Sequence, residues 1–140
     1  MVAILWSDIE AEFIGYIGPA LDERPEAYAA DVMVRNTVPD ETVDDPWPTS
    51  LRLVVVRNDG GPTTRDVRAN PRLGIQVWGS SEEETSDLAN LLVALVGGWR
   101  SPAVRSTNPS LPFWVTEESR RPKQYFPAEL MIRGRALPGA

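Results

Sequence analysis

The sequence contains no cysteine, no histidine and only one lysine, Lys123, among its 140 residues. Without cysteine the chain can form no disulfide, thiolate nucleophile, thiolate-ligated zinc site or iron–sulfur cluster. Without histidine it lacks the most common general base and metal ligand of proteins. An enzyme with this composition would depend on carboxylates, tyrosines, hydroxyl groups or the single lysine, so most familiar catalytic centres are excluded.

The sequence also lacks a hydrophobic run long enough to cross a membrane. Its longest uncharged stretch, residues 88–99, has twelve residues, whereas a membrane-spanning helix needs about 20. Met1 is not followed by a basic segment, an apolar run and a small-residue cleavage site, so no secretory leader is indicated. Apolar residues make up 42% of the chain and charged residues 24%, which is typical of soluble globular domains. We expect one soluble domain over residues 1–140 that contacts no membrane.

The net charge of −6 is unevenly distributed along the chain. Residues 1–48 contain eleven acids and two arginines, a balance of −9, whereas the remainder contains twelve basic residues and nine acids, a balance of +3. The basic residues are scattered along the sequence and nearly balanced by acids, which argues against a nucleic-acid-binding surface. A strongly acidic segment is suited to repelling a polyanion or to contacting a basic partner.

Two helices are predicted. Ser7 and Glu10 have the spacing of a capping box, so the first helix should begin near Asp8 and end at Gly18 and Pro19. The second should begin after Ser80 or Ser81, which precede three glutamates, and should end at Gly97 and Gly98. Apolar residues recur at helical spacing in both segments: they are Ile9, Phe13 and Ile17 in the first, and Leu88, Leu91, Leu92 and Leu95 in the second. We expect Leu91 and Leu95 to be core residues.

The strand predictions come from alternating or continuous apolar residues. Strands are expected at 32–38, 51–56, 111–116 and 125–137. After a turn at 58–62, residues 63–68 and 73–77 should form one return strand, interrupted by a kink at Asn70 and Pro71, and a charged hairpin tip is expected at 117–124. The second strand is apolar on both sides, so it should be covered on both faces for part of its length. This order predicts an α+β fold with a mostly antiparallel β-sheet and two main α-helices packed on it.

A projecting loop is predicted at about 38–50. Its prolines remove backbone donors and its acids resist burial, so it cannot form a strand interior. Its apolar residues should then contact another subunit, and its acids should line a passage or a docking face. The interface candidates are Val38, Val43 and Trp47, and the acids are Asp40, Glu41, Asp44 and Asp45. These acids could also hold a hard cation, but their spacing lacks the EF-hand pattern.

Other possible catalytic or ligand-binding motifs have ordinary structural explanations. Glu117 and Glu118 could form an acid and base pair, but the basic residues that follow them would lower the pKa of both carboxyls. The glycine-rich segment 58–62 lacks any phosphate-binding pattern and reads as a turn. We therefore expect no catalytic, cofactor-binding or metal-binding residue, and no enzymatic activity.

Four motifs give the chain a resemblance to a known family. They are V-x-V-R-x-x-V-P at 32–39, L-x-L-V-V-V-R-x-x-G-G at 51–61, R-L-G-I-Q-V-W-G at 72–79 and A-x-L-L-x-x-L-V at 89–96. Together they resemble the small tail terminator proteins of phages with long non-contractile tails, especially those of actinobacterial hosts. The resemblance covers most of the chain, and its motifs describe shape rather than catalysis.

The resemblance implies a structural virion protein assembled in the host cytoplasm. Such a subunit forms a homohexameric ring on the head-proximal end of the tail tube, ends tube polymerisation and joins the tail to the neck. Its partners would be copies of itself, the tail tube protein and a neck or head-completion protein. The genome DNA would pass through the ring without specific binding. The family has no catalytic residue to transfer to this chain.

Two other classes remain open. Another neck or head-completion protein would share this composition, and would be recognised by binding filled heads rather than tail tubes. A small carboxylate-dependent enzyme would lose activity when Glu117, Glu118, Asp44 and Asp45 are replaced together.

Overall fold

The structure is a computed structural model that describes residues 3–39, 52–63, 67–115 and 122–137. The helical elements are α1 (Ile9–Asp22), the short 3-10 helix η1 (Ala27–Ala29) and α2 (Glu82–Gly97). The strands are β1 (Ile4–Leu5), β2 (Val32–Arg35), β3 (Arg52–Asn58), β4 (Arg68–Ala69), β5 (Arg72–Trp78), β6 (Val104–Pro109), β7 (Phe113–Trp114), β8 (Lys123–Arg133) and β9 (Arg135–Ala136). These elements form an α+β fold, as the sequence predicts.

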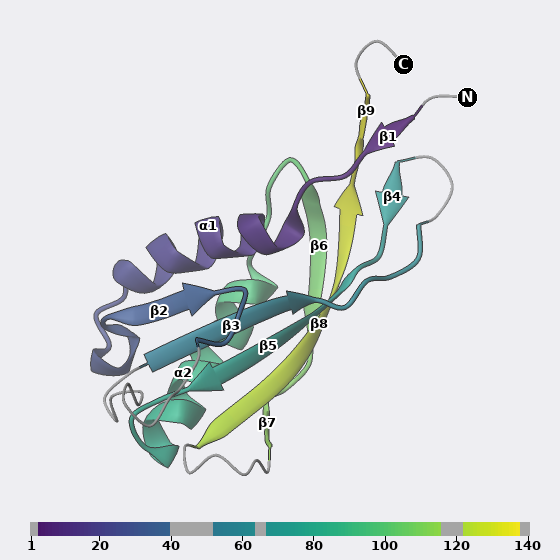
Figure 1. The fold of residues 1–140 in the computed structure, drawn as a ribbon. Coiled ribbons are helices and arrows are strands. Elements are labelled where there is room, and N and C mark those ends of the chain that lie inside the picture. The colour runs from purple at the N-terminus through teal and green to yellow at the C-terminus, as the bar shows by residue number, and fades with distance from the viewer. Residues whose placement is uncertain (1–2, 40–51, 64–66, 116–121, 138–140) are drawn as a thin grey trace.

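The main sheet is built around the long strand β8. Its strand order is β2-β3-β5-β8-β4, and β6 and β7 also pair with β8 (Figure 1). Because β5 and β7 both pair with residues 124–125 of β8, they must lie along its opposite edges. The β2 and β3 pair is parallel and the other pairs are antiparallel, so the mostly antiparallel sheet is confirmed.

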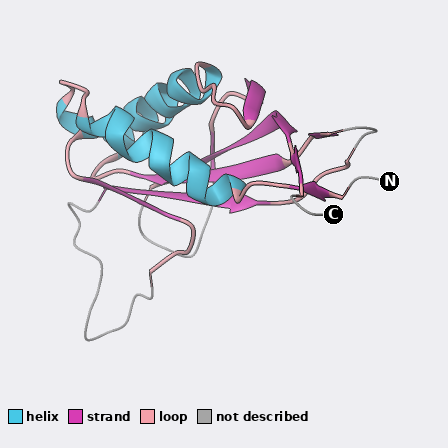
Figure 2. Cartoon of the chain, turned by 90° about the horizontal axis from the view of Figure 1, so that it is seen from above, coloured by secondary structure: helices cyan, strands magenta, loops and turns pink. Residues whose placement is uncertain are grey.

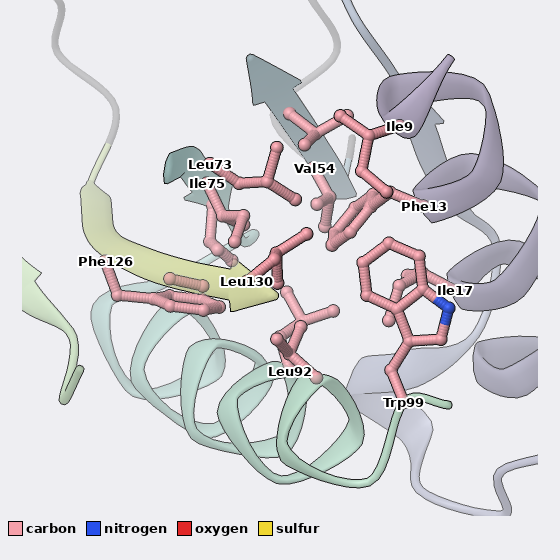
Figure 3. Close-up of a cluster of buried hydrophobic side chains, with 14 of the residues drawn as sticks. Ile9, Phe13, Ile17, Val54, Leu73, Ile75, Leu92, Trp99, Phe126 and Leu130 are labelled. Atoms are coloured by element: carbon pink, nitrogen blue, oxygen red, sulfur yellow. The ribbon is translucent and has the colours of Figure 1, made fainter. Parts of the chain in front are cut away.

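Both α-helices cover the same face of the main sheet (Figure 2). Their apolar stripes meet the sheet in one buried cluster (Figure 3). Trp99 is buried at the end of α2, where its ring contacts Phe13 edge-on and stacks on Tyr16, with centroids 5.8 and 5.7 Å apart. The Tyr16 hydroxyl donates to the Leu95 carbonyl at 3.0 Å, which ties α1 to α2.

The first helix differs from its prediction at both ends. Asp8, not Ser7, is the N-cap, and its carboxylate accepts from the Ala11 N–H at 3.2 Å. Glu10 does not complete a capping box, because its carboxylate accepts from the Asn58 N–H of β3 at 2.6 Å. Gly18 and Pro19 lie inside the helix, which continues to Asp22. The extra turn buries Leu21 four residues after Ile17, and this burial offsets the cost of an internal proline.

The second helix begins as predicted. The Ser81 hydroxyl accepts from the Glu84 N–H at 3.1 Å, and the helix ends at Gly97. Leu88 and Leu92 are fully buried, whereas Leu91 and Leu95 pack against the core but remain partly exposed. The prediction that Leu91 and Leu95 are core residues is therefore confirmed only in part, because the buried face of α2 is centred on Leu88, Leu92 and Val96.

Several strand predictions need correction. Residues 104–109 form β6, a strand that the sequence analysis did not predict, because this segment pairs with the available edge of β8. The short strand β4 also pairs with β8 rather than forming the return strand predicted at 63–68, of which residues 64–66 lie outside the described chain. The strand predicted at 125–137 divides at Gly134, where a Cβ atom would lie 2.4 Å from Ile4 Cγ2. This close approach lets β9 leave the main sheet and pair with β1.

Candidate subunit interface

The loop predicted as an interface arm is described only at its beginning. Val38 is 45% exposed, as a contact residue in a free subunit would be. Val43 and Trp47, with the acids Asp40, Glu41, Asp44 and Asp45, lie outside the described residues, and so do Glu117 and Glu118. The predictions made for these residues stay predictions.

The described chain has an exposed apolar surface at β7 that the sequence analysis did not single out. We name Leu111, Phe113 and Trp114 the β7 patch; these side chains are 77%, 51% and 50% exposed. The Phe113 ring contacts the ring of Tyr125 on β8 edge-on, with centroids 5.5 Å apart. The patch is thus anchored to the sheet on one side and open on the other. A cluster of large apolar residues outside the core is typical of a protein contact site.

The edges of the sheet add backbone groups to this surface. Within the described chain, β7 pairs only with β8, and β2 pairs only with β3. Each strand therefore has one edge whose N–H and C=O groups can pair with another strand. A sheet with two such edges can pair with a strand of a second chain along either edge.

The face of the sheet away from the helices carries a second buried cluster. Leu53 and Val55 of β3 alternate with the residues that face the helices, and they lie with Trp78 and Met33. Residues 53–56 are all fully buried, which confirms that this strand is covered on both faces. The ammonium group of Lys123 lies over the Trp78 ring, 5.0 Å from its centroid.

A hollow of about 590 Å³ lies where β8 ends and β9 begins. We name it the arginine hollow because Arg105, Arg133 and Arg135 line it, together with Glu12 of α1. Burial raises the pKa of the Glu12 carboxyl, and nearby Asp8 raises this pKa further. Its Oε2 atom is buried without a hydrogen-bond partner. The hollow therefore combines several cations with one carboxyl whose ionisation is disfavoured.

The arginine hollow corrects the view that the basic residues are scattered. Arg105 and Arg133 are distant in sequence, but the pairing of β6 with β8 brings them to one end of the sheet. Hydrophobic periodicity carries no information about this non-local pairing. The sequence analysis places a strand at 111–116, and the signal that its large apolar residues lie at the sheet edge is Pro112 between them, since proline within a sheet is confined to edge strands.

The described ranges contain no cluster of three or more acidic residues that could hold a metal ion. No described helix is long and apolar enough to cross a membrane.

Comparisons with known proteins assign no family to the chain. Neither a scan against protein-family models nor a search of curated proteins gives a match. The resemblance to tail terminators therefore rests on the four motifs alone. In the structure their residues lie mainly in β2, β3, β5 and α2, where many of them are buried, so the motifs describe the core rather than a partner surface.

Proposed function

We propose that this protein is a structural subunit that assembles into a ring, caps the head-proximal end of a phage tail tube and ends tube polymerisation. The observation that carries the proposal is the β7 patch, an exposed apolar surface held on the edge of a well-packed sheet. Such a surface lowers the solubility of a monomer, and covering it with a partner lowers the free energy of the assembly.

The shape of the fold supports the same proposal. A ring requires each subunit to contact its neighbours through two different surfaces that close on themselves. The open edges of β2 and β7 lie on opposite margins of the main sheet, so the fold offers two different surfaces for contact with another subunit or with the tube (Figure 1). The number of six subunits, the tail tube and neck partners and the location in the virion come from the motif resemblance, and we propose them on that basis.

The test combines the purified protein with tail tubes. Light scattering of the protein alone should give a mass several times 15.5 kDa. Electron microscopy should show a ring at one end of each tube, and added protein should stop tube growth. Binding to filled heads but not to tubes would instead identify a neck or head-completion protein. A monomer both alone and with tubes would refute the proposal.

A variant links the assay to the surface. Phe113→Ser combined with Trp114→Ser should leave the subunit folded with a moderately lower melting temperature, because both side chains are about half exposed, but should weaken ring formation or tube capping at temperatures where the subunit is folded. Leu137→Ser is the matched control, since Leu137 is also an exposed apolar residue at 41% and lies outside the β7 patch. Equal loss of capping in both variants would remove β7 from the interface.

A further inference from the structure

The arginine hollow has an excess of positive charge that the described chain does not neutralise. The side chains of Arg105, Arg133 and Arg135 are exposed, and none of them has an ion pair with a described residue. By contrast, Arg24, Arg52 and Arg72 elsewhere in the fold each pair with a glutamate. Three arginines without an ion pair to a described residue thus lie together at one end of the molecule.

The backbone itself brings these cations together. The register between β6 and β8 shifts between Val104 and Ser106, so Arg105 is the additional residue of a β-bulge. Bulges redirect side chains at sheet edges and beside functional sites. On the other edge of β8, Arg68 lies directly opposite Arg133. The pairing of β4 with β8 therefore places a further arginine beside Arg133.

A second hollow extends the basic surface. It has a volume of about 350 Å³ and is lined by Val67, Arg68, Arg105, Met131 and Arg133. Arg105 and Arg133 line both hollows, so the two hollows adjoin at these arginines near the end of β8. An extended surface of this kind fits several carboxylates on one protein segment better than a single small anion.

The opposite end of the molecule carries complementary charge. The last residue of β5, Trp78, pairs with Lys123 at the start of β8, and α2 begins soon after Trp78. The arginine hollow lies at the other end of β8, which has eleven residues and is therefore roughly 35 Å long. Figure 1 shows this separation between the start of α2 and the region around β9. The exposed acids at the start of α2 are Glu82, Glu83 and Asp87, and none has an ion pair with a described residue.

We infer that the arginine hollow of one copy of this chain binds the Glu82, Glu83 and Asp87 carboxylates of a second copy, head to tail. The two surfaces differ in charge and lie at opposite ends, so the contact is heterologous and each copy can both give and receive it. Repeated contacts produce a ring if the rotation closes. The inference deepens the proposed function and rests on it for the claim that the contacts close into a ring. The contact between two copies is argued from charge complementarity alone.

The contact should govern specificity and salt dependence more than total affinity. Exposed ion pairs contribute little individually, but they steer association and disfavour wrong orientations. Screening weakens them as ionic strength rises. Assembly that depends on this contact should therefore weaken with added salt, in contrast to assembly held only by the apolar β7 patch.

Charge reversal at each end tests the inference. One variant carries Arg105→Glu and Arg133→Glu, and the other carries Glu82→Lys and Glu83→Lys. At low ionic strength, each should raise the concentration needed for assembly by roughly tenfold or more, because several attractive pairs become repulsive. The matched control, Arg57→Glu, reverses an exposed arginine of β3 away from both ends and should assemble as the wild type does. Circular dichroism and thermal melts establish that each variant is folded.

Mixing the two charge-reversed variants gives the decisive measurement. The unaltered hollow of the lysine variant can bind the unaltered acidic helix start of the glutamate variant. The hollow that carries the two new glutamates can bind the helix start that carries the two new lysines. An equimolar mixture should therefore assemble although neither variant does so alone. Should the lysines disturb the start of α2, Glu82→Gln with Glu83→Gln gives a milder loss at the same surface. Light scattering and sedimentation velocity measure all arms.

The outcomes separate this inference from the proposed function. Wild-type assembly that both charge-reversed variants retain would overturn the contact and leave the ring proposal standing. Loss in both variants without recovery in the mixture would also overturn the contact. A wild-type monomer at low ionic strength, alone and with tail tubes, would overturn both. Assembly that recovers on mixing, in particles that do not cap tubes, would support the contact and refute the terminator function.

Discussion

Replacing Leu92 with alanine tests the packing of α2 on the sheet most directly. Leu92 is fully buried in the main cluster between α2 and the sheet (Figure 3). Leu92→Ala removes a buried isobutyl group and leaves a cavity, so it should lower the free energy of unfolding by about 3 kcal/mol, within the usual 2 to 5 kcal/mol. Leu91, its neighbour, is only partly buried. Leu91→Ala should therefore cost about 1 kcal/mol, or roughly half of the burial free energy of a leucine side chain.

Urea denaturation followed by circular dichroism measures both variants. With a slope near 2 kcal/mol per M for a chain of this size, the midpoint should fall by about 1.5 M for Leu92→Ala and about 0.5 M for Leu91→Ala. The slope itself should not change, because the fold is the same. An equal or larger loss for Leu91→Ala would show that α2 is rotated about its axis relative to this structure, and would refute the packing argument.

Three further predictions follow from local contacts. Gly134→Ala should cost about 1 to 3 kcal/mol in urea melts, because its Cβ atom would overlap Ile4. Arg52→Lys should destabilise the fold in the same assay, because a lysine cannot replace the guanidinium group that bonds both the Glu84 carboxylate and a backbone carbonyl. Burial raises the pKa of the Glu12 carboxyl, so the folded state binds this proton more tightly than the unfolded state does. Protonation of Glu12 therefore stabilises the fold below the ordinary pKa, and this contribution to the free energy of unfolding should be lost as the pH rises through the raised pKa. Glu12→Gln should remove that part of the pH dependence; if the stability profile above pH 4.5 is the same in this variant as in the wild type, Glu12 does not cause it.

The local signals in the sequence predicted the helices and the central strands well. The Ser81 cap, the apolar stripe of α2 and the hairpin of β3 with β5 depend on residues near one another in the chain. Such signals express capping and burial, which act over a few residues. The Pro19 prediction failed because burial of Leu21 outweighed a local helix-breaking preference.

Long-range pairing was the main part of the fold that the sequence did not reveal. The parallel pairing of β2 with β3, the short pair of β1 with β9 and the placement of β6 along β8 all join segments that lie apart in the sequence, and the segments of β1, β6 and β9 also have weak patterns of their own. The segment of β6 is polar in sequence, with Val104 followed by arginine, serine, threonine and asparagine, and only Val104 is buried. Its strand conformation comes from the backbone groups that the edge of β8 offers, which is a tertiary effect.

The same distinction separates the motifs of the family resemblance from the surfaces that would carry function. Residues such as Val54, Ile75 and Leu92 belong to those motifs and are fully buried, so any chain with this layer of helices on this sheet has a physical reason to keep them. The β7 patch and the arginine hollow lie outside the motifs and are exposed. Partners contact exposed residues, so a chain could retain all four motifs and bind different partners. The surface variants therefore test the function more directly than any comparison of core motifs does.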